Sequence, residues 1–517
     1  MSADTLASLP PTPDPNVESA NDRSTGGLSE SHTPPTAVHT SGPAPTETIS
    51  RNLAGSITAT AILAFLGLLL ETVVGVLFPA LMETFGIGMG AVSWMTTGYL
   101  LVVSLTMPLS GFLQRRFTAR SLFMTAALVV FAGAIIAATA QIYPVLLAGR
   151  ILQGVGTGIS TPLMFSIIMM QAPRAKVGML MGVGALVLGS APALGPTLGG
   201  VIGTMAGWRV VFWMTLPLLA VAAVVGWRSI QQVTPTSKAP LAFGQLILLA
   251  IGLIGLVLGI EQLGSLLSGG TQAAVLQVVV SIALVVLGLA SLAWFAMAAR
   301  RSSNPLLQLS VLRDRGYTWS LLAFCCLQFV ALGLGYLLPN YVQLALGRTS
   351  LVGGLLVLPG AIVGAALAPV AGSLFDKFGA KLPITIGVVT ALVATVAMAL
   401  FGVKAGVVGL SAFYLVFMFG FALCFANSQT NGMAKVRREL TPDATAMMNT
   451  CQQFAAAVAM TVLSTIIAVN QTGLAPGSTE FQAGTTSGAG IAFWVIVALV
   501  AAALAAELRA FASRKEA

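Results

Sequence analysis

The chain has 517 residues, of which only 8% are Asp, Glu, Lys or Arg, whereas 56% are hydrophobic and the mean hydropathy is +0.92. Soluble globular proteins carry about 25% charged residues because their surfaces face water. The composition therefore indicates a protein whose surface faces lipid, and it excludes soluble enzymes, DNA-binding proteins and secreted disulfide-bonded domains. The net charge of +9 is typical of basic loops at a membrane surface, so no nucleic-acid partner is expected.

Residues 1–50 differ from the rest of the chain. They are rich in Pro, Ser and Thr and hold six acidic residues and one arginine. Such a segment buries too little apolar surface to offset the entropy of ordering, so we predict a disordered cytoplasmic tail. Both histidines, His32 and His39, lie in it. The remaining chain therefore lacks the residues for a His-based catalytic triad or a His-ligated metal site.

Fourteen apolar segments of about 20 residues follow, each long enough to cross a ~30 Å hydrocarbon core as a helix. The predicted spans are 57–79, 91–113, 120–140, 143–168, 178–203, 208–227, 241–261, 273–297, 317–338, 350–373, 380–400, 405–430, 445–468 and 489–509. They predict an all-α polytopic membrane protein with both termini on the same side. The four cysteines lie inside these spans without CxxC spacing, which favours small core residues over redox or metal sites.

Basic residues between the spans indicate the orientation. With a cytoplasmic N-terminus, sixteen of them lie in cytoplasmic loops and three, Arg209, Arg348 and Lys404, lie outside. Cytoplasmic loops of membrane proteins are enriched in Lys and Arg. We therefore expect a multi-pass protein of the bacterial plasma membrane with both termini in the cytoplasm.

One segment occurs twice. Gly111-Phe-Leu113-Gln-Arg115 follows the second span, and Gly372-Ser-Leu374-Phe-Asp376 follows the tenth, with Gly379 shortly after it. In both copies Gly-x-Leu precedes a charged tight turn, which we interpret as a conformational turn. Repeated halves are typical of secondary transporters.

The repeat predicts a division of the chain into four parts. Two six-helix bundles are expected at 51–230 and 317–509, with two inserted helices at 241–297 between them and the tail before them.

Five motifs occur in order at corresponding spans. They are Leu70-Glu71-Thr72 to Pro79, the turn at Gly111 to Arg116, Arg150-Ile-Leu-Gln153-Gly154, Gly195-Pro196-Thr-Leu-Gly199-Gly200 and Trp208-Arg209-Val-Val-Phe212. With them the chain resembles the fourteen-span drug:proton antiporters of the major facilitator superfamily over about residues 57–509. The resemblance implies the major facilitator fold and an antiporter motif at Gly195, Pro196, Gly199 and Gly200.

Two departures from the family pattern stand out. Arg115 occupies the position where the family usually has Asp in the first cytoplasmic turn, whereas the later copy keeps the acid as Asp376. Gln452 stands in the thirteenth span where many relatives have Arg. Both departures resemble the lincomycin-resistance exporter branch, and they put the usual charge pairing of the first turn in doubt.

Glu71 is expected to be the acidic side chain that lies well inside a span. A charge at mid-membrane costs about 2.5–3.5 kcal/mol even on the mild insertion scale, so such residues usually serve function. We predict that Glu71 couples transport to protons and contacts cationic drugs, with Arg150 as the cation that modulates it. Gln153 and Thr157 extend a polar stripe along the helix of Arg150. The alternative is that Glu71 and Arg150 form a buried structural pair.

Two further features bear on transport. Gly195 and Pro196 are expected to bend the fifth span and, with the following glycines, to offer a smooth surface for another helix. The candidate substrate-cavity residues are Tyr99, Gln153, Gln328, Tyr336, Asn340, Asn427, Asn449 and Gln453. Apolar walls with a few polar groups suit amphipathic drugs, although such residues also serve ordinary packing.

The sequence thus predicts proton-coupled efflux of amphipathic or cationic drug-like molecules by a monomer, without a cofactor and without enzymatic activity. Export of an endogenous metabolite, lipid or antibiotic is the main alternative. A non-transporting receptor or scaffold is a third hypothesis, which the Gly195-Pro196 motif and the intramembrane Glu71 disfavour.

Overall fold

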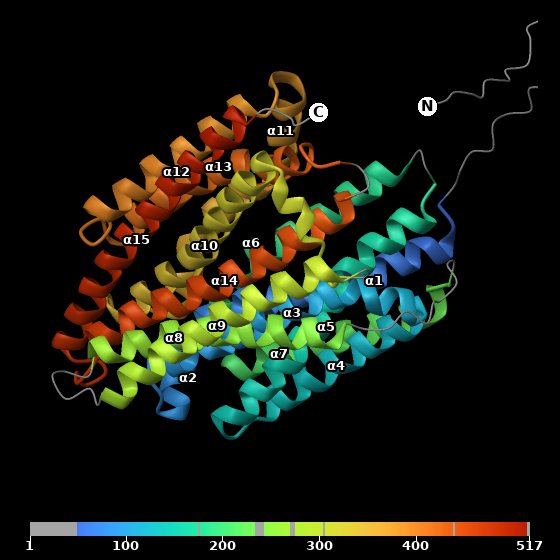
Figure 1. Cartoon of the computed structure of the whole chain (residues 1–517). Coiled ribbons are helices and arrows are strands. Elements are labelled where there is room, and N and C mark those ends of the chain that lie inside the picture. Colours follow the sequence, from blue (N-terminus) through green and yellow to red (C-terminus); the bar gives the residue numbers. More distant parts are fainter. Residues whose placement is uncertain are drawn as a thin grey trace, which may run out of the picture. The chain divides into compact units, whose positions relative to one another are not determined.

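The computed structural model describes residues 49–173, 176–232, 242–268, 275–302, 305–437 and 440–513. The predicted disordered tail, up to residue 48, lies outside the described residues, as do three of the sixteen basic residues predicted in cytoplasmic loops, Arg174, Lys238 and Arg438. All regular elements in the described ranges are helices (Figure 1). This confirms the prediction of an all-α polytopic protein.

The first group of helices extends to residue 229. It consists of α1 (Arg51–Val76), α2 (Phe78–Phe85), α3 (Met89–Arg116), α4 (Ala119–Thr139), α5 (Tyr143–Gln171), α6 (Val177–Met205) and α7 (Trp208–Ser229). Two helices follow it, α8 (Phe243–Ser268) and α9 (Val275–Arg301).

The last group begins after a short 3₁₀ helix, η3 (Leu309–Arg313). It consists of α10 (Arg315–Leu344), α11 (Ser350–Phe378), α12 (Lys381–Phe401), α13 (Gly406–Met433), α14 (Thr441–Gln471) and α15 (Thr479–Ala512). Thirteen helices in the described ranges are long and apolar enough to cross a membrane. The predicted span 178–203 coincides with a further long helix, α6, of 29 residues.

Several predicted span boundaries differ from the helix ends, and two of the differences have a clear local cause. The first span does not run to Pro79, because α1 ends at Val76 and α2 begins with Pro79 in its first turn, where the missing N–H costs no hydrogen bond. The last span begins ten residues before its predicted start of 489. Ser478 caps α15 by accepting a hydrogen bond from the Phe481 backbone N–H at 3.1 Å, so the polar stretch after it is helical.

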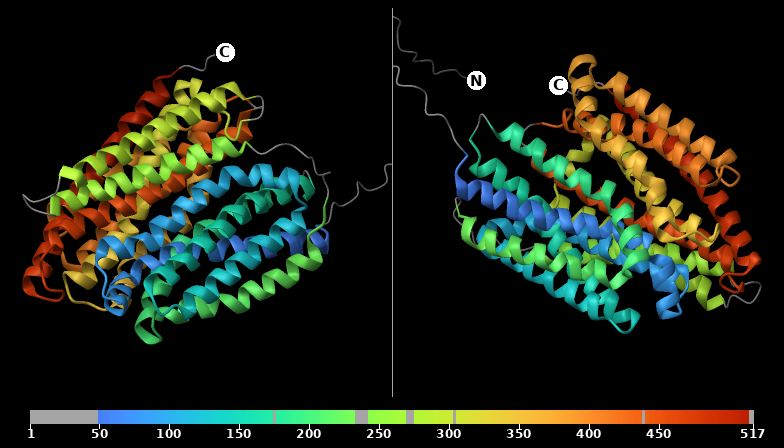
Figure 2. Two further views of the ribbon diagram at one scale, coloured as in Figure 1. Left: turned by 60° about the horizontal axis from the view of Figure 1, so that its bottom comes forward. Right: turned by 180° about the vertical axis from the view of Figure 1, so that it is seen from behind.

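The helices pack in two groups and a pair. Helices α1 and α3–α7 contact one another, α10–α15 contact one another, and α8 packs along α9 (Figure 2). The pair is attached through α8, which contacts α3 of the first group and α14 of the last. The domain boundaries stay predictions, because the contacts gather residues 48–517 into a single unit.

Glycine pairs bring consecutive helices into backbone contact in each part of the fold. A Cβ added at any of these glycines would lie 2.5–3.3 Å from backbone atoms of the facing helix. The pairs are Gly133 with Gly149 (α4 and α5), Gly255 with Gly288 (α8 and α9) and Gly387 with Gly420 (α12 and α13). Such small residues let helices approach closely where lipid provides no hydrophobic drive for association.

Three alternate glycines of α5, Gly154, Gly156 and Gly158, pack against neighbouring helices. Gly154 faces the Tyr99 carbonyl of α3, whereas Gly156 faces the Ala126 carbonyl of α4, and Gly158 returns to Thr106 of α3. Alternate glycines therefore hold α5 against two neighbours at once. The run is a packing element of this helix.

The two groups meet near one end of their helices, which we name the closed end. It is the end at which α1, α6 and α10 finish and α11 begins. Asn340 donates a hydrogen bond to the Gly75 carbonyl at 2.8 Å, and Gln343 donates to the Val76 carbonyl at 3.0 Å. Phe78 packs on Tyr336 with ring centroids 5.5 Å apart. Toward the opposite, open end, which carries Arg51 and Ala512, the groups diverge (Figure 2).

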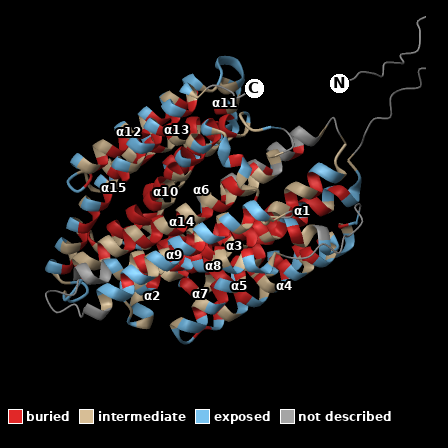
Figure 3. Ribbon diagram, viewed as in Figure 1, coloured by how far each residue is buried: buried red, intermediate tan, exposed pale blue. Residues whose placement is uncertain are grey.

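Buried residues line the facing sides of the helices, whereas many apolar residues on the outer sides are exposed (Figure 3). Trp213, Trp227 and Trp294 are among the exposed apolar residues. This pattern is the reverse of a soluble protein and fits a surface covered by lipid.

The Gly133–Gly149 crossing makes a stability prediction. Gly149→Ala places a methyl group 2.8 Å from the Gly133 carbonyl oxygen, so α4 and α5 must separate. We expect a loss of about 1–3 kcal/mol, seen as a lower melting temperature of the purified protein in detergent. Gly490→Ala is the matched control, because no atom lies within 4 Å of its added Cβ. Equal melting temperatures for the two variants would contradict the proposed contact.

Candidate functional site

Glu71 is buried in α1, with 4% of its surface exposed. It lies twenty residues after Arg51 and five before Val76, or about 7.5 Å from the closed end of the helix at 1.5 Å per residue. Glu71 thus lies inside a helix long and apolar enough to cross a membrane, although α1 begins six residues earlier than expected and ends before Pro79.

Arg150 is fully buried in α5 at a similar depth, seven residues after Tyr143. Its Nε donates to the Met95 carbonyl of α3 at 3.2 Å, and its Nη1 donates to Gln153 Oε1 at 2.7 Å. The guanidinium carbon lies 4.2 Å from the centre of the Tyr99 ring. Three contacts thus fix the orientation of this cation, one of them through the face of an aromatic ring.

Tyr99 joins the three helices around this cation. Its hydroxyl donates to the Gly67 carbonyl of α1 at 2.8 Å and bonds Thr157 Oγ1 of α5 at 2.9 Å. The ring itself comes from α3 and is fully buried. Tyr99 was predicted to line a substrate cavity, but here it is part of the packed support of Arg150.

Three polar atoms of this cluster remain unsatisfied. Glu71 Oε2, Arg150 Nη2 and Gln153 Nε2 are buried and have no hydrogen-bond partner among the described residues. Glu71 and Arg150 interact electrostatically, but the hydrogen bonds of Arg150 go to Met95 and Gln153. Buried groups without partners are costly, so this cluster is a candidate for protons or ligands.

The predicted antiporter motif lies on α6 between two neighbours. Gly195 and Gly199 face Thr72 and Val73 of α1, the two residues that follow Glu71. Gly200 faces the Ser350 carbonyl of α11, with only 2.5 Å left for a Cβ. The glycine surface is therefore packed against helices of both groups.

The α6–α11 contact is reciprocal. A Cβ at Gly354 of α11 would lie 2.5 Å from the Pro196 carbonyl, so each helix places a glycine against the backbone of the other. Thr204 Oγ1 lies 2.8 Å from Ser350 Oγ and accepts from the Leu351 N–H at 3.1 Å. Helix α6 continues through Pro196 without a break. We call this contact, formed by Pro196, Gly200, Thr204, Ser350 and Gly354, the α6–α11 interface.

The predicted conformational turns lie at the open end. Helix α11 ends at Phe378, and Gly379 follows with φ of 75°, a value that favours glycine. The first copy has Thr118 there, which instead caps α4 by accepting from the Ser121 N–H. Gly111 and Gly372 face open space.

The two turns carry opposite charges after Gly-x-Leu-x, Arg115 in the first copy and Asp376 in the later one. The side chain of Arg115 lies outside the described part of the structure. Asp376 is exposed, and no ion pair to it occurs among the described residues.

The remaining candidate cavity residues do not form one site. Tyr336 and Asn340 are buried at the closed end, and Asn427 is buried on α13, where it donates to the Ala371 carbonyl at 3.0 Å. Gln328 on α10 accepts from Gln452 on α14 at 3.2 Å, and both are half-buried.

Two candidates lie on α14 beside this pair. Asn449 is half-buried, whereas Gln453 is buried and its Oε1 has no partner among the described residues. With Gln328 and Gln452 they form a set of amides on α10 and α14, which we name the amide set.

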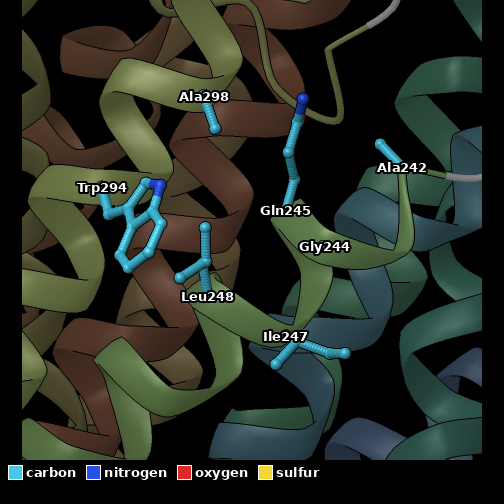
Figure 4. A pocket seen from close by; sticks show the side chains of 7 residues that line it. All are labelled: Ala242, Gly244, Gln245, Ile247, Leu248, Trp294 and Ala298. Atoms are coloured by element: carbon cyan, nitrogen blue, oxygen red, sulfur yellow. The ribbon is translucent and has the colours of Figure 1, made fainter.

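An open cavity of about 550 Å³ lies elsewhere, on α8 and α9 (Figure 4). It is lined by Ala242, Gly244, Gln245, Ile247, Leu248, Trp294 and Ala298. None of the predicted substrate residues contributes to it. Gln245 is also engaged, since its Oε1 accepts from the Leu306 backbone N–H at 2.8 Å.

Sequence reasoning missed two acidic residues inside helices. Glu261 is the last residue of the predicted span 241–261, but α8 continues seven residues beyond it, and Glu261 Oε2 accepts from Trp94 Nε1 at 2.6 Å. Glu507 lies five residues before the end of α15 and is fully buried. Its position within the apolar stretch was the available signal, but the predicted span ended two residues after it.

Comparison with known proteins identifies the family. A family model of the Major Facilitator Superfamily matches residues 60–460. The lincomycin resistance protein LmrB of Listeria monocytogenes is 33% identical over 83% of this chain and 90% of its own length. Its namesake in Bacillus subtilis is 34% identical over 79% and 84%, respectively.

Solved structures agree on the fold. A peptide transporter of the POT family in complex with sulfate superposes with a TM-score of 0.64 at 17% identity, covering 90% of this chain and 96% of the other. With the family model and these relatives, the chain belongs to the Major Facilitator Superfamily and is a multi-pass membrane transporter.

Proposed function

We propose that this protein exports drugs or other amphipathic small molecules across the bacterial plasma membrane in exchange for protons, working as a monomer by alternating access. The observation that carries the proposal is the buried Glu71–Arg150 cluster, in which both charged groups retain an unsatisfied atom. Relatives named lincomycin resistance proteins, similar over most of both chains, support a drug-like substrate.

The coupling step is assigned to Glu71 because Arg150 is held in place. Met95, Gln153 and Tyr99 fix the guanidinium, and Arg does not give up its proton usefully. Glu71 has an unpartnered oxygen that can take up a proton. Proton binding there cancels the attraction to Arg150 and allows α1 to change its packing against α5. Moving one charge through 100 mV supplies about 2.3 kcal/mol, which is enough to bias such a step.

The conformational step is assigned to the closed end. Described cations such as Arg116, Lys176, Arg301 and Lys377 lie at the open end, which favours a cytoplasmic location for that end. The structure then corresponds to an inward-facing state, with the outer side shut by the α6–α11 interface. The glycine motif of α6 also packs on α1 next to Glu71, so protonation and opening can be coupled through one helix.

Substrate binding is assigned to the amide set. Its half-buried members lie on α10 and α14, and α14 also packs against α3 of the first group. Amide groups can donate or accept hydrogen bonds, which suits varied amphipathic molecules. A substrate there contacts the last group of helices, while the proton is bound in the first.

The first test removes the coupling carboxylate. In inverted membrane vesicles, Glu71→Gln should reduce uptake of lincomycin and of a lipophilic cationic dye driven by a pH gradient to the level of vesicles without the protein. Gln keeps the size of Glu but cannot bind the proton. Dye and drug transport are followed by fluorescence and by radiolabel.

The matched control is Glu83→Gln, which changes an exposed carboxylate on α2 and should transport normally. Full pH-driven transport by Glu71→Gln would show that Glu71 is not the residue that couples transport to protons. Normal folding with no transport of any drug by the wild-type protein would instead favour an endogenous metabolite, lipid or antibiotic as substrate.

The second test concerns the α6–α11 interface. Gly354→Ala inserts a methyl group 2.5 Å from the Pro196 carbonyl and should destabilise the closed end by about 1–3 kcal/mol. Amide hydrogen exchange of residues 345–356 should then rise by roughly 5–150-fold. Gly335→Ala, on α10 with no atom within 4 Å of the added Cβ, is the control. Unchanged exchange in Gly354→Ala would show that this interface does not keep the outer side shut.

A further inference from the structure

Glu507 forms a second buried carboxylate centre, far along the chain from Glu71. It is fully buried near the open end, about 7.5 Å from the last residue of α15 at 1.5 Å per residue. The Ser428 hydroxyl of α13 donates a hydrogen bond to its Oε1. Its Oε2 is buried without a partner among the described residues. One oxygen is therefore held, and the other is free to carry a proton.

The nearby cation, Lys435, divides its interactions between Glu507 and other groups. Lys435, just after α13, is half-buried and interacts electrostatically with Glu507 and with Asp314, the cap residue of α10. Its Nζ donates to the Ala510 carbonyl of α15 rather than to the carboxylate. Burial lowers the pKa of Lys435, and the two carboxylates oppose that shift.

The other charged and titratable neighbours are accounted for. On α13 the thiol of Cys424 is buried and interacts with Glu507. Arg509 of α15 points elsewhere, with its guanidinium carbon 4.8 Å from the centre of the Trp319 ring of α10. Lys381 of α12 is exposed, and Asp443 of α14 is half-buried with a partner of its own. Lys435 is thus the one described cation that interacts with this carboxylate.

An ionised Glu507 in this place needs compensation that it only partly receives. A buried carboxylate is stabilised when several donors satisfy its oxygens, and here one hydroxyl and a cation bonded elsewhere are available. Adding a proton to Oε2 removes the buried charge without breaking the Ser428 bond. Nothing beyond a proton from water at the open end is required.

We propose that Glu507 is a second proton-binding site of this transporter, separate from Glu71 and located in the last group of helices. Uptake of the proton at Oε2 gives a neutral acid and leaves Lys435 with Asp314 and the α15 carbonyl. Loss of the proton draws Lys435 toward the carboxylate and tightens α13 against α15. A role in transport rests on the function proposed above, whereas proton binding at Glu507 does not.

The test is infrared difference spectroscopy of the purified full-length protein in lipid nanodiscs, titrated without substrate or gradient. Above about pH 6, where exposed carboxyl groups are already ionised, the wild type should still show the C=O band of protonated buried acids. Glu507→Gln should remove one component of this band, and Glu71→Gln should remove a different one. Glu480→Gln, an exposed acid on the same helix, should change nothing.

A second variant guards against a folding defect in Glu507→Gln. Ser428→Ala keeps the carboxyl group but removes its hydrogen-bond donor, so the Glu507 component should move to higher frequency. A band that Glu507→Gln leaves intact, or a component that Ser428→Ala does not shift, would overturn the proposal and indicate a carboxylate that stays ionised beside Lys435. Because neither readout involves transport, failure of coupling at Glu71 cannot be mistaken for failure here.

Discussion

A charged group inside these helices has no water or lipid partner, so the protein itself has to supply every compensating contact. Arg150 meets this demand almost completely through a carbonyl, an amide and an aromatic face. Glu71 and Glu507 meet it incompletely, since each keeps one buried oxygen without a hydrogen bond among the described residues. The contrast separates a fixed cation from two carboxyl groups that can change their protonation state. Each group of helices thus holds one such buried carboxyl group, Glu71 near the closed end and Glu507 near the open end.

Glycine serves two purposes in this fold. Between α4 and α5, Gly133 and Gly149 make a crossing within one group of helices that nothing in transport needs to break. Between α6 and α11, Gly200 and Gly354 make an equally close contact, but across the two groups, where alternating access requires separation. The same geometry can serve a permanent contact and a separable one. A backbone contact without side chains gains only modest dispersion energy and does not interlock side-chain rotamers, so it can also be broken. The hydroxyls of Thr204 and Ser350 add polar contacts that water can replace on opening.

The type and order of the long helices could be predicted because a membrane demands long apolar segments. Composition alone predicted a lipid-facing protein, and the motifs predicted the family. Boundaries at Pro79 and Ser478 depended on local capping, which a hydropathy pattern does not contain. That Glu71 and Arg150 are charged residues inside helices could be predicted from the apolar segments around them. Their partners could not, because Tyr99 and Met95 reach Arg150 only through the tertiary packing of α3. Glu507 was overlooked for a related reason, since burial near a helix end depends on its neighbours Ser428 and Lys435.

The attachment of α8 and α9 makes the two lateral sides of the transporter unequal. On one side α3 and α14 meet and α8 lies against both of them. On the other side α6 and α11 meet, and the helix that also contacts both of them is α1 of the first group rather than α8 or α9. From the bilayer, the contact between α3 and α14 is therefore flanked by α8, whereas in the described chain the contact between α6 and α11 is not flanked by either of the two inserted helices. For a substrate that enters from the bilayer, this asymmetry would give lateral entry a direction within the plane of the membrane.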